Sequence, residues 1–193
     1  MHAAEPGRAV WEIREDASRD VLVALYLRDA LGVVDSTGLP RMLGTGLPDA
    51  AEPATPALAL GWMRWWIPLI EPDAPDWTPP FGEDPFGGPA SPADPFTRAV
   101  RTHLDSARSW AAVAHEQYNG SAIMRMQRPD TVVHDLIAER ESALGRASRP
   151  FRLRIEVLPL AASGVWWIGD DVIAVDETTR NEPILSRDAL EPV

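Results

Sequence analysis

The 193-residue chain is long enough for one domain with its own core, and it has no cysteine, which excludes disulfides, thiolate nucleophiles and cysteine-ligated metals. All 18 basic residues are arginines, so lysine Schiff bases and a phosphate-binding P-loop lysine are excluded as well. The formal charge of −11 opposes binding to nucleic acid or anionic membranes, and no apolar run reaches the roughly 18–20 residues that span a bilayer.

The first half of the chain predicts two helices separated by a loop. Residues 1–17 are polar, and we expect them to be only partly ordered. Residues 18–31 predict a helix with Ser18 as N-cap and Gly32 as terminator, although the apolar run inside it is also compatible with a buried strand. The segment 32–54 is rich in Gly and Pro and predicts a loop.

Thr55-Pro56 predicts the start of a second helix over residues 57–67, which Pro68 would end. Nine prolines then mark residues 68–95 as an extended connector. Its three aromatic residues favour a segment packed on the domain, but a mobile linker is the alternative.

Two further helices are predicted in the middle of the chain. From Phe96 to Tyr118 apolar residues recur at steps of three and four, which predicts a helix over 95–118 closed by Asn119-Gly120. Residues 131–144 predict another helix, capped by Asp130 and ended by Gly145.

The end of the chain changes to strand patterns. Residues 151–157 alternate strictly between apolar and charged, and residues 165–175 predict a hairpin with Gly169 first in a two-residue turn. That register pairs Ile168 with Asp171 and Trp166 with Ile173. Residues 178–193 predict a turn at Pro183 and a short helix from Ser186.

These elements predict a single α+β domain over residues 1–193, with N-terminal and central helices packed on a small C-terminal antiparallel sheet. The sheet would be a β-meander over residues 150–176, formed by one strand and the hairpin. No alternating βαβ pattern favours a doubly wound fold or a TIM barrel.

The sequence contains none of the common catalytic, phosphate-binding or metal-binding motifs, so we expect neither a metal nor a cofactor and lean against an enzyme. Five dispersed residues are still candidates for a small-ligand site between the 95–118 helix and the sheet: His103, His115, Arg152, Arg154 and Asp171. The two histidines point about 120° apart around one helix axis and cannot share a metal. The two arginines share one face of their strand, where they could bind a phosphate or carboxylate or pair with the protein's own acids.

Eight tryptophans are unusual for this length, and exposed tryptophan is typical of protein interfaces. The interface candidates are Trp62, Trp65, Trp66, Trp77 and Trp167. The alternative is that the Pro-rich segment covers these rings and completes the core.

The turn Gly169-Asp170-Asp171 resembles a hairpin of bacterial immunity-type domains, which have an acidic surface and a sheet carrying Trp and Asp. The similar segment is short, and no site residue is transferred from it.

The leading hypothesis is a non-catalytic protein-binding or regulatory module of the bacterial cytoplasm, for example an inhibitor or immunity-type partner of a basic protein. The arginine-only, Ala-, Gly- and Pro-rich composition favours a bacterial source, and the N-terminus lacks a secretory signal. The alternatives are an enzyme or small-anion-binding protein of unfamiliar type, and a subunit of a homo-oligomer.

Overall fold

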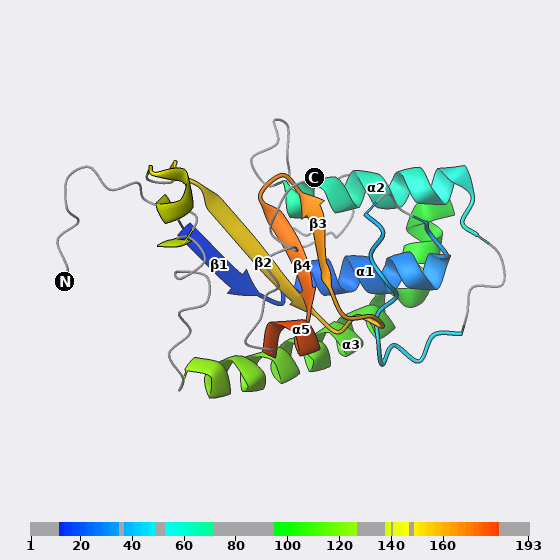
Figure 1. The fold of residues 1–193 in the computed structure, drawn as a ribbon. Helices are drawn as coiled ribbons and strands as arrows, with labels where there is room; N and C mark the ends of the chain where they lie inside the picture. Colours follow the sequence, from blue (N-terminus) through cyan, green and yellow to red (C-terminus); the bar gives the residue numbers. More distant parts are fainter. Residues whose placement is uncertain are drawn as a thin grey trace.

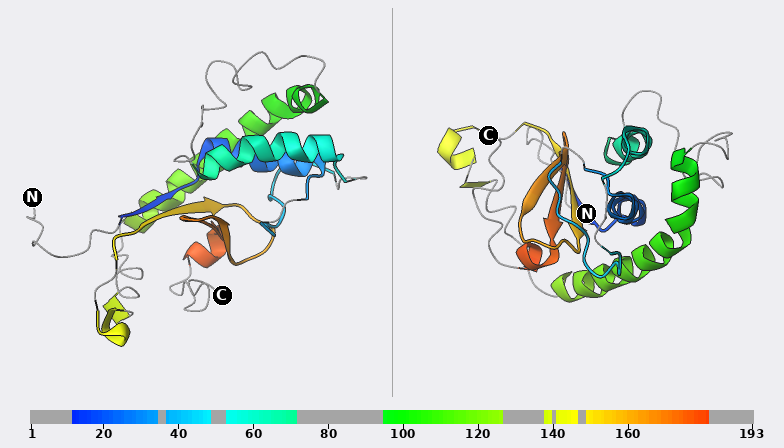
Figure 2. Two further views of the ribbon diagram at one scale, coloured as in Figure 1. Left: turned by 90° about the horizontal axis from the view of Figure 1, so that it is seen from above. Right: turned by 90° about the vertical axis from the view of Figure 1, so that its right-hand side faces the viewer.

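The computed structural model describes residues 12–34, 37–48, 53–71, 95–126, 138–139, 141–146 and 149–181. Two of the three long helices lie on one side of a four-stranded sheet, the third runs from that side past the end of the sheet, and a short helix lies on the other side (Figure 1; Figure 2). The α+β class is therefore confirmed.

The first helix, α1 (Arg19–Leu31), is the centre of the core. Every side chain from Val21 to Asp29 is buried, because α2 (Pro56–Ile70), α3 (Pro95–Met126) and the sheet surround it. A helix that is buried all round has no polar face, which explains why its sequence is also compatible with a strand. It begins after Ser18 and ends at Gly32, whose φ of 66° is the left-handed conformation that favours glycine.

Helices α2 and α3 both continue beyond the residues that were expected to end them. Thr55 caps α2 as predicted, but the helix passes through Pro68 to Ile70. Pro68 removes one hydrogen bond near the end of the helix, whereas Ile70 is buried and the Leu69 carbonyl accepts a bond from Arg154. These tertiary contacts favour one more turn.

Asn119-Gly120 likewise does not end α3, which continues to Met126. Tyr118 is buried just before this pair, and Arg125 just after it contacts a strand of the sheet. These contacts offset the low helix propensity of Asn and Gly. The predicted helix over 131–144 lies mostly outside the described residues, although 141–144 are helical.

The sheet is mixed and not purely antiparallel, which corrects the predicted arrangement. Its order is β1 (Glu12–Asp16), β2 (Arg152–Leu158), β4 (Val172–Asp176) and β3 (Val165–Gly169). The pairs β1–β2 and β2–β4 are parallel, and only β3–β4 is antiparallel. The N-terminal edge strand was not expected, because only Ile13 in it is apolar and its partner lies about 140 residues away along the chain.

The predicted hairpin forms, but its register differs. Trp166 lies opposite Ala174, Gly169 lies opposite Val172, and the ladder is irregular between Trp167 and Gly169. The turn is Asp170-Asp171, which keeps both carboxylates exposed. The backbone of Arg154 also donates to the Asp171 carbonyl at 2.8 Å, and this contact holds the turn against β2.

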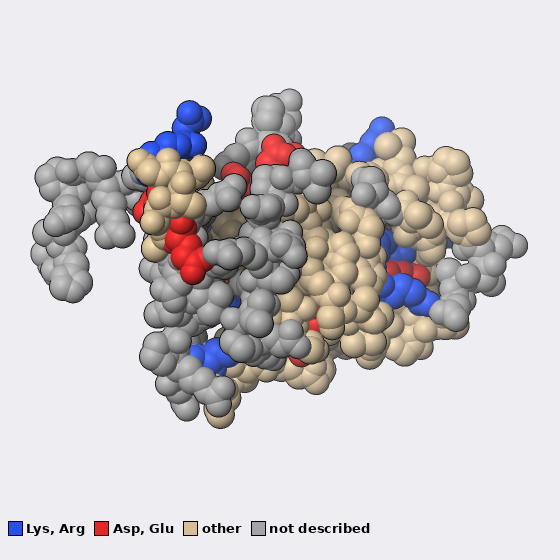
Figure 3. Space-filling view, viewed as in Figure 1, with Lys and Arg blue, Asp and Glu red and all other residues tan. Residues whose placement is uncertain are grey.

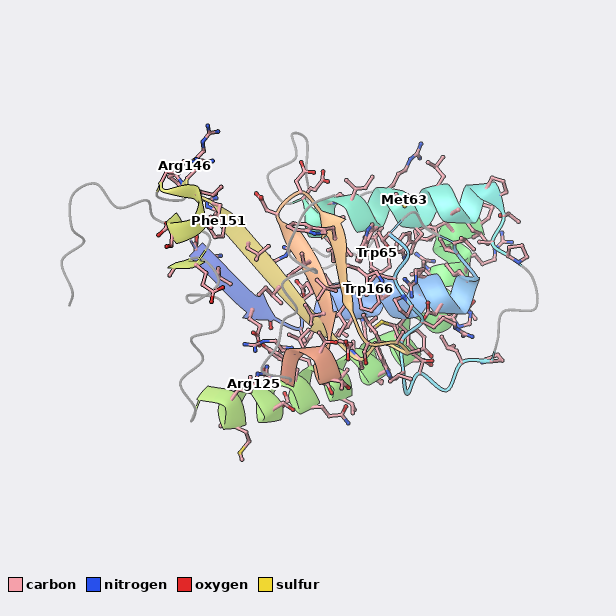
Figure 4. All side chains as sticks on the ribbon, in the orientation of Figure 1. Met63, Trp65, Arg125, Arg146, Phe151 and Trp166 are labelled. Carbon is pink, nitrogen blue, oxygen red and sulfur yellow. The ribbon has the colours of Figure 1, made fainter. Side chains whose placement is uncertain are left out.

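The registers place alternate residues of β1, β2 and β4 on the face that contacts α1 and α2. This face carries Arg14, Arg154 and Glu156, as shown by contacts of Arg154 with Leu69 and of Glu156 with Ser18. On the opposite face Glu15 accepts hydrogen bonds from Arg125 of α3 at 2.7 Å and from Arg180 of α5 (Glu177–Asn181) at 2.5 Å. Figure 4 shows Arg125 beside α5 at the end of the sheet. Charged side chains thus join helices to both faces of the sheet.

No helix in the described part of the chain is long and apolar enough to cross a membrane.

Candidate functional site

A pocket of about 510 Å³ lies at one end of the sheet, where α2 ends. Its charged residues come from β1, from β2, from the β3–β4 turn and from Glu71, the first residue after α2. The apolar lining is Ile70, Leu153 and Val172; the charged lining is Glu12, Arg14, Glu71, Arg152, Arg154, Asp170 and Asp171. The volume is within the usual range of ligand sites, and most of the lining residues are charged.

The arginines of the pocket already interact with the protein. The Nε of Arg14 donates to Glu12 at 2.7 Å, and the Nε of Arg152 lies 3.8 Å from the other oxygen of the same carboxylate. Arg154 donates through Nη2 to the Leu69 carbonyl at 2.7 Å and pairs with Glu156, with 3.4 Å between Nε and Oε1.

The carboxylates on the other side of the pocket differ from these arginines in their pairing. The described residues provide no hydrogen bond or ion pair to the side chains of Glu71, Asp170 or Asp171, and all three are exposed. Figure 3 shows acidic atoms at the surface where the β3–β4 turn meets the end of α2. This side of the pocket therefore presents negative charge that no group among the described residues neutralises.

Glu156, two residues further along β2 than the pocket residue Arg154, is 1% exposed. Its Oε2 accepts a hydrogen bond from the backbone N–H of Ser18 at 2.9 Å, whereas Oε1 has no hydrogen bond. Burial raises the pKa of Glu156 to about 7, against the opposing effects of the Ser18 hydrogen bond and the Arg154 charge. Near neutral pH this carboxyl group is therefore close to half-protonated.

The five candidate ligand residues do not all converge. Arg152, Arg154 and Asp171 line the pocket, but the two histidines of α3 do not. His103 is half-buried on α3, and His115 donates through Nδ1 to the Ala17 carbonyl at 2.8 Å, a contact that holds α3 against the start of α1. The pocket lies against α2, not against the 95–118 helix where we expected it.

Three of the five interface candidates lie in the core. Trp62 donates from Nε1 to the Ala24 carbonyl at 2.8 Å and stacks on Trp66 with 5.2 Å between ring centroids, and Trp65 packs edge-on against Phe96. These buried rings cannot contact a partner. Trp167 is 43% exposed, and Trp77 lies outside the described residues.

Seven of the ten pocket residues were not candidates from the sequence, and four of these come from segments whose structure differs from the predicted one. Glu12 and Arg14 were missed because the strand that carries them was not predicted, and Ile70 and Glu71 because Pro68 was expected to end the helix. The available signal was the run of charged residues around Ile13, since edge strands commonly carry charged side chains.

Among the described residues, no three His, Asp or Glu side chains are placed to hold a metal ion. Comparisons with protein-family models, with curated proteins and with solved structures gave no match, so the chemistry of the pocket is the basis for a functional proposal.

Proposed function

We propose that the protein is a non-catalytic protein-binding module, and that its pocket receives a basic side chain of a partner protein. The observation that carries the proposal is the unequal pairing of the pocket charges. Arg14 and Arg154 already have carboxylate partners within 3.4 Å, whereas Glu71, Asp170 and Asp171 have none among the described residues.

The net charge of the whole chain also favours a basic partner. A net charge of −11 attracts a basic partner and accelerates its association at low ionic strength. It also makes two copies of this chain repel each other, so a different, basic protein fits better than a homo-oligomer.

A small-anion site, the alternative, has less support. An anion entering the pocket would have to replace existing interactions of the arginines. It would also approach three carboxylates that have no partner in the described part of the chain. A cationic group meets neither obstacle.

The test is calorimetric titration with a decapeptide of alternating Arg and Gly, and with its Glu-for-Arg counterpart, at low and high salt. The variant Glu71→Gln/Asp170→Asn/Asp171→Asn removes the proposed acceptors. The matched control Asp20→Asn/Asp105→Asn/Glu116→Gln removes the same charge from exposed positions on α1 and α3.

We expect salt-sensitive binding of the Arg peptide alone, weakened at least about tenfold in the pocket variant and much less in the control. Equal weakening in both variants would mean that only the net charge matters, and would overturn the assignment of the pocket. Tighter binding of the Glu peptide would favour the anion site instead.

A further inference from the structure

We infer that the exposed face of α2, which runs into the pocket, is the docking surface for an amphipathic helix of the basic partner protein. This inference rests on the proposed function and names the part of the partner that supplies the basic side chain. It follows from the composition of α2, from the spacing of its exposed residues and from the charges along them.

Helix α2 lacks the polar face that a surface helix normally has. Arg64 is the only charged residue among its 15 residues, yet Leu60 is 53% exposed and Ile67 is 40% exposed. A helix that is apolar all round is normally covered on every side. Because α2 lies at the outside of the helical layer (Figure 2), its outward face is a surface that a partner can cover.

Four exposed residues form a straight line along α2, which we call the α2 stripe. They follow one another at steps of four, three and four: Leu60, Arg64, Ile67 and Glu71. At about 100° per residue they lie within an arc of about 60°. The N–H of Glu71 donates to the Ile67 carbonyl at 2.9 Å, so the stripe keeps its helical course to its last residue. Steps of four and three are the spacing at which two helices pack side by side, so the stripe fits a helix better than an extended chain.

The charges along the α2 stripe define the chemistry of the partner helix. Glu71 belongs both to the stripe and to the pocket, where the carboxylates of Asp170 and Asp171 also have no partner among the described residues. Arg64 lies two turns earlier, and the described part of the chain offers it no hydrogen bond or ion pair. Figure 3 shows basic atoms above α2 beside uncharged surface. The partner helix therefore needs a basic residue at the pocket and an acidic residue two turns away.

The partner helix also needs apolar side chains to cover Leu60 and Ile67. These two residues are seven positions apart on one line of α2, so apolar residues at the same spacing on the partner contact both. Removing this apolar surface from water favours association in a way that salt does not screen.

Two other occupants fit the α2 stripe less well. A second copy of this chain would bring together two molecules that each carry a net charge of −11. A membrane surface would meet the three carboxylates at the pocket end of the stripe, and anionic lipids would repel the whole chain.

The experiment measures the affinity of the full chain for a fluorescent peptide of about 20 residues, built on alanine and glutamine so that it is largely helical. One face of the peptide carries leucine, glutamate, leucine and arginine at steps of four, three and four. In a matched peptide serine replaces both leucines, and the decapeptide of alternating Arg and Gly is the non-helical reference. We expect the leucine peptide to bind at least about tenfold more tightly than the serine peptide at equal salt.

Two variants locate the apolar contact. Leu60→Ser/Ile67→Ser should lower the affinity for the leucine peptide to that for the serine peptide and leave the decapeptide unaffected. The control Val113→Ser/Ile123→Ser removes exposed apolar side chains from α3 and should alter neither. Equal affinity of the two helical peptides would overturn this inference, while the proposed function would stand if the decapeptide still depends on the pocket carboxylates. No binding of any basic peptide would contradict both.

Arg64→Glu tests the register of the two helices, at high salt where the long-range attraction is screened. The variant should bind the leucine peptide about threefold to tenfold more weakly, and a peptide with arginine in place of its glutamate should restore the affinity. A merely structural role of Arg64 would not give this rescue. Loss of affinity without rescue would overturn the predicted register.

Thiol labelling tests whether the α2 stripe is accessible, since the chain has no cysteine of its own. The single variants Ile67→Cys and Val113→Cys should react with a maleimide at similar rates, and the leucine peptide should slow the reaction of Ile67→Cys alone.

Three results of this labelling would overturn the inference. Slow reaction of Ile67→Cys in the dilute free protein would show that the chain covers its own stripe. Slow reaction only at high protein concentration would identify a second copy as the occupant. Protection by phosphatidylcholine vesicles instead of the peptide would identify a lipid surface.

Discussion

Two arginine–carboxylate pairs of this protein have a buried carboxylate, and they differ in how completely their hydrogen bonds are made. In α1, Arg28 and Asp29 are both buried, with 2.8 Å between Nη2 and Oδ1. Arg28 also donates to the carbonyls of Leu39 and Pro40, and Asp29 accepts from the backbone N–H of Met42. The Arg154–Glu156 pair is longer, at 3.4 Å, and the facing atoms Nε and Oε1 have no hydrogen bond.

The Arg28–Asp29 pair therefore has a structural role, whereas the Arg154–Glu156 pair contains a group that titrates near neutral pH. The charges of Arg28 and Asp29 are compensated by each other and by the loop around Pro40, which they fasten to α1. Glu156 is buried with fewer compensating bonds, so its pKa rises to about 7 and its charge changes near neutrality, beside the pocket residue Arg154.

The largest expected effect is at the structural pair. Asp29→Asn leaves the Arg28 guanidinium buried without its counter-charge and turns an N–H group toward existing donors. We expect a loss of about 3–5 kcal/mol in the free energy of unfolding, measured by urea denaturation at pH 8. A loss below about 1 kcal/mol would show that water reaches this pair and that the comparison is wrong.

Glu156 should make stability depend on pH. Its carboxyl group holds a proton more tightly in the folded chain than in the unfolded chain, where the ordinary pKa is 4.5. Its contribution is therefore fully present below about pH 4.5 and is lost as pH rises to about 7, by about 3 kcal/mol in total.

Glu156→Gln tests this dependence, because it keeps the shape of the protonated side chain. The variant should be at least as stable as the natural chain at pH 8 and should lack the loss of stability between pH 4.5 and 7. Thermal unfolding over this pH range gives the comparison. If the stability of both proteins falls equally steeply with pH, titratable groups other than Glu156 cause the loss.

Arg154→Met sharpens the comparison further. Without the guanidinium, the pKa of Glu156 should rise above 7, because the Arg154 charge now lowers it. We expect a loss of about 1–2 kcal/mol at pH 8, below the range for a fully buried pair because Arg154 is 27% exposed. The double variant Arg154→Met/Glu156→Gln should recover much of this loss, and simple additivity of the two changes would show that the pair is not coupled.

The smallest effect is expected at the surface pair of the pocket. Glu12→Gln removes the carboxylate from an exposed pair with Arg14, so the free energy of unfolding should change by at most about 0.5 kcal/mol. Urea denaturation of this variant and of the Asp29→Asn variant under the same conditions compares the two losses in free energy of unfolding. A change as large as that of Asp29→Asn would mean that the edge strand depends on this contact.

The elements that the sequence predicted well are those with local signals. Helix α1 ends at a glycine with positive φ, α2 begins at Thr55-Pro56, and β2 alternates in polarity, and each of these features depends on a few neighbouring residues. The candidates Arg152, Arg154 and Asp171 were found for the same reason, because strand alternation puts the two arginines on one face and Asp171 lies in a turn.

The features that the sequence did not predict depend on distant partners. Strand β1 exists because β2 pairs with it, and the last turns of α2 and α3 are held by contacts with Arg154 and Glu15. The buried state of Trp62, Trp65 and Trp66 likewise follows from packing, since aromatic residues on a helix look the same whether a partner protein or the core covers them.

By itself the sequence determined that this chain forms an acidic α+β domain without cysteine chemistry, since composition and local periodicity suffice for that. Which charged side chains lie close together was decided only by the tertiary structure. The pocket joins β1, β2, the β3–β4 turn and the end of α2, segments separated by up to about 160 residues. Which carboxylates remain without a partner depends on these long-range registers, which no local pattern encodes.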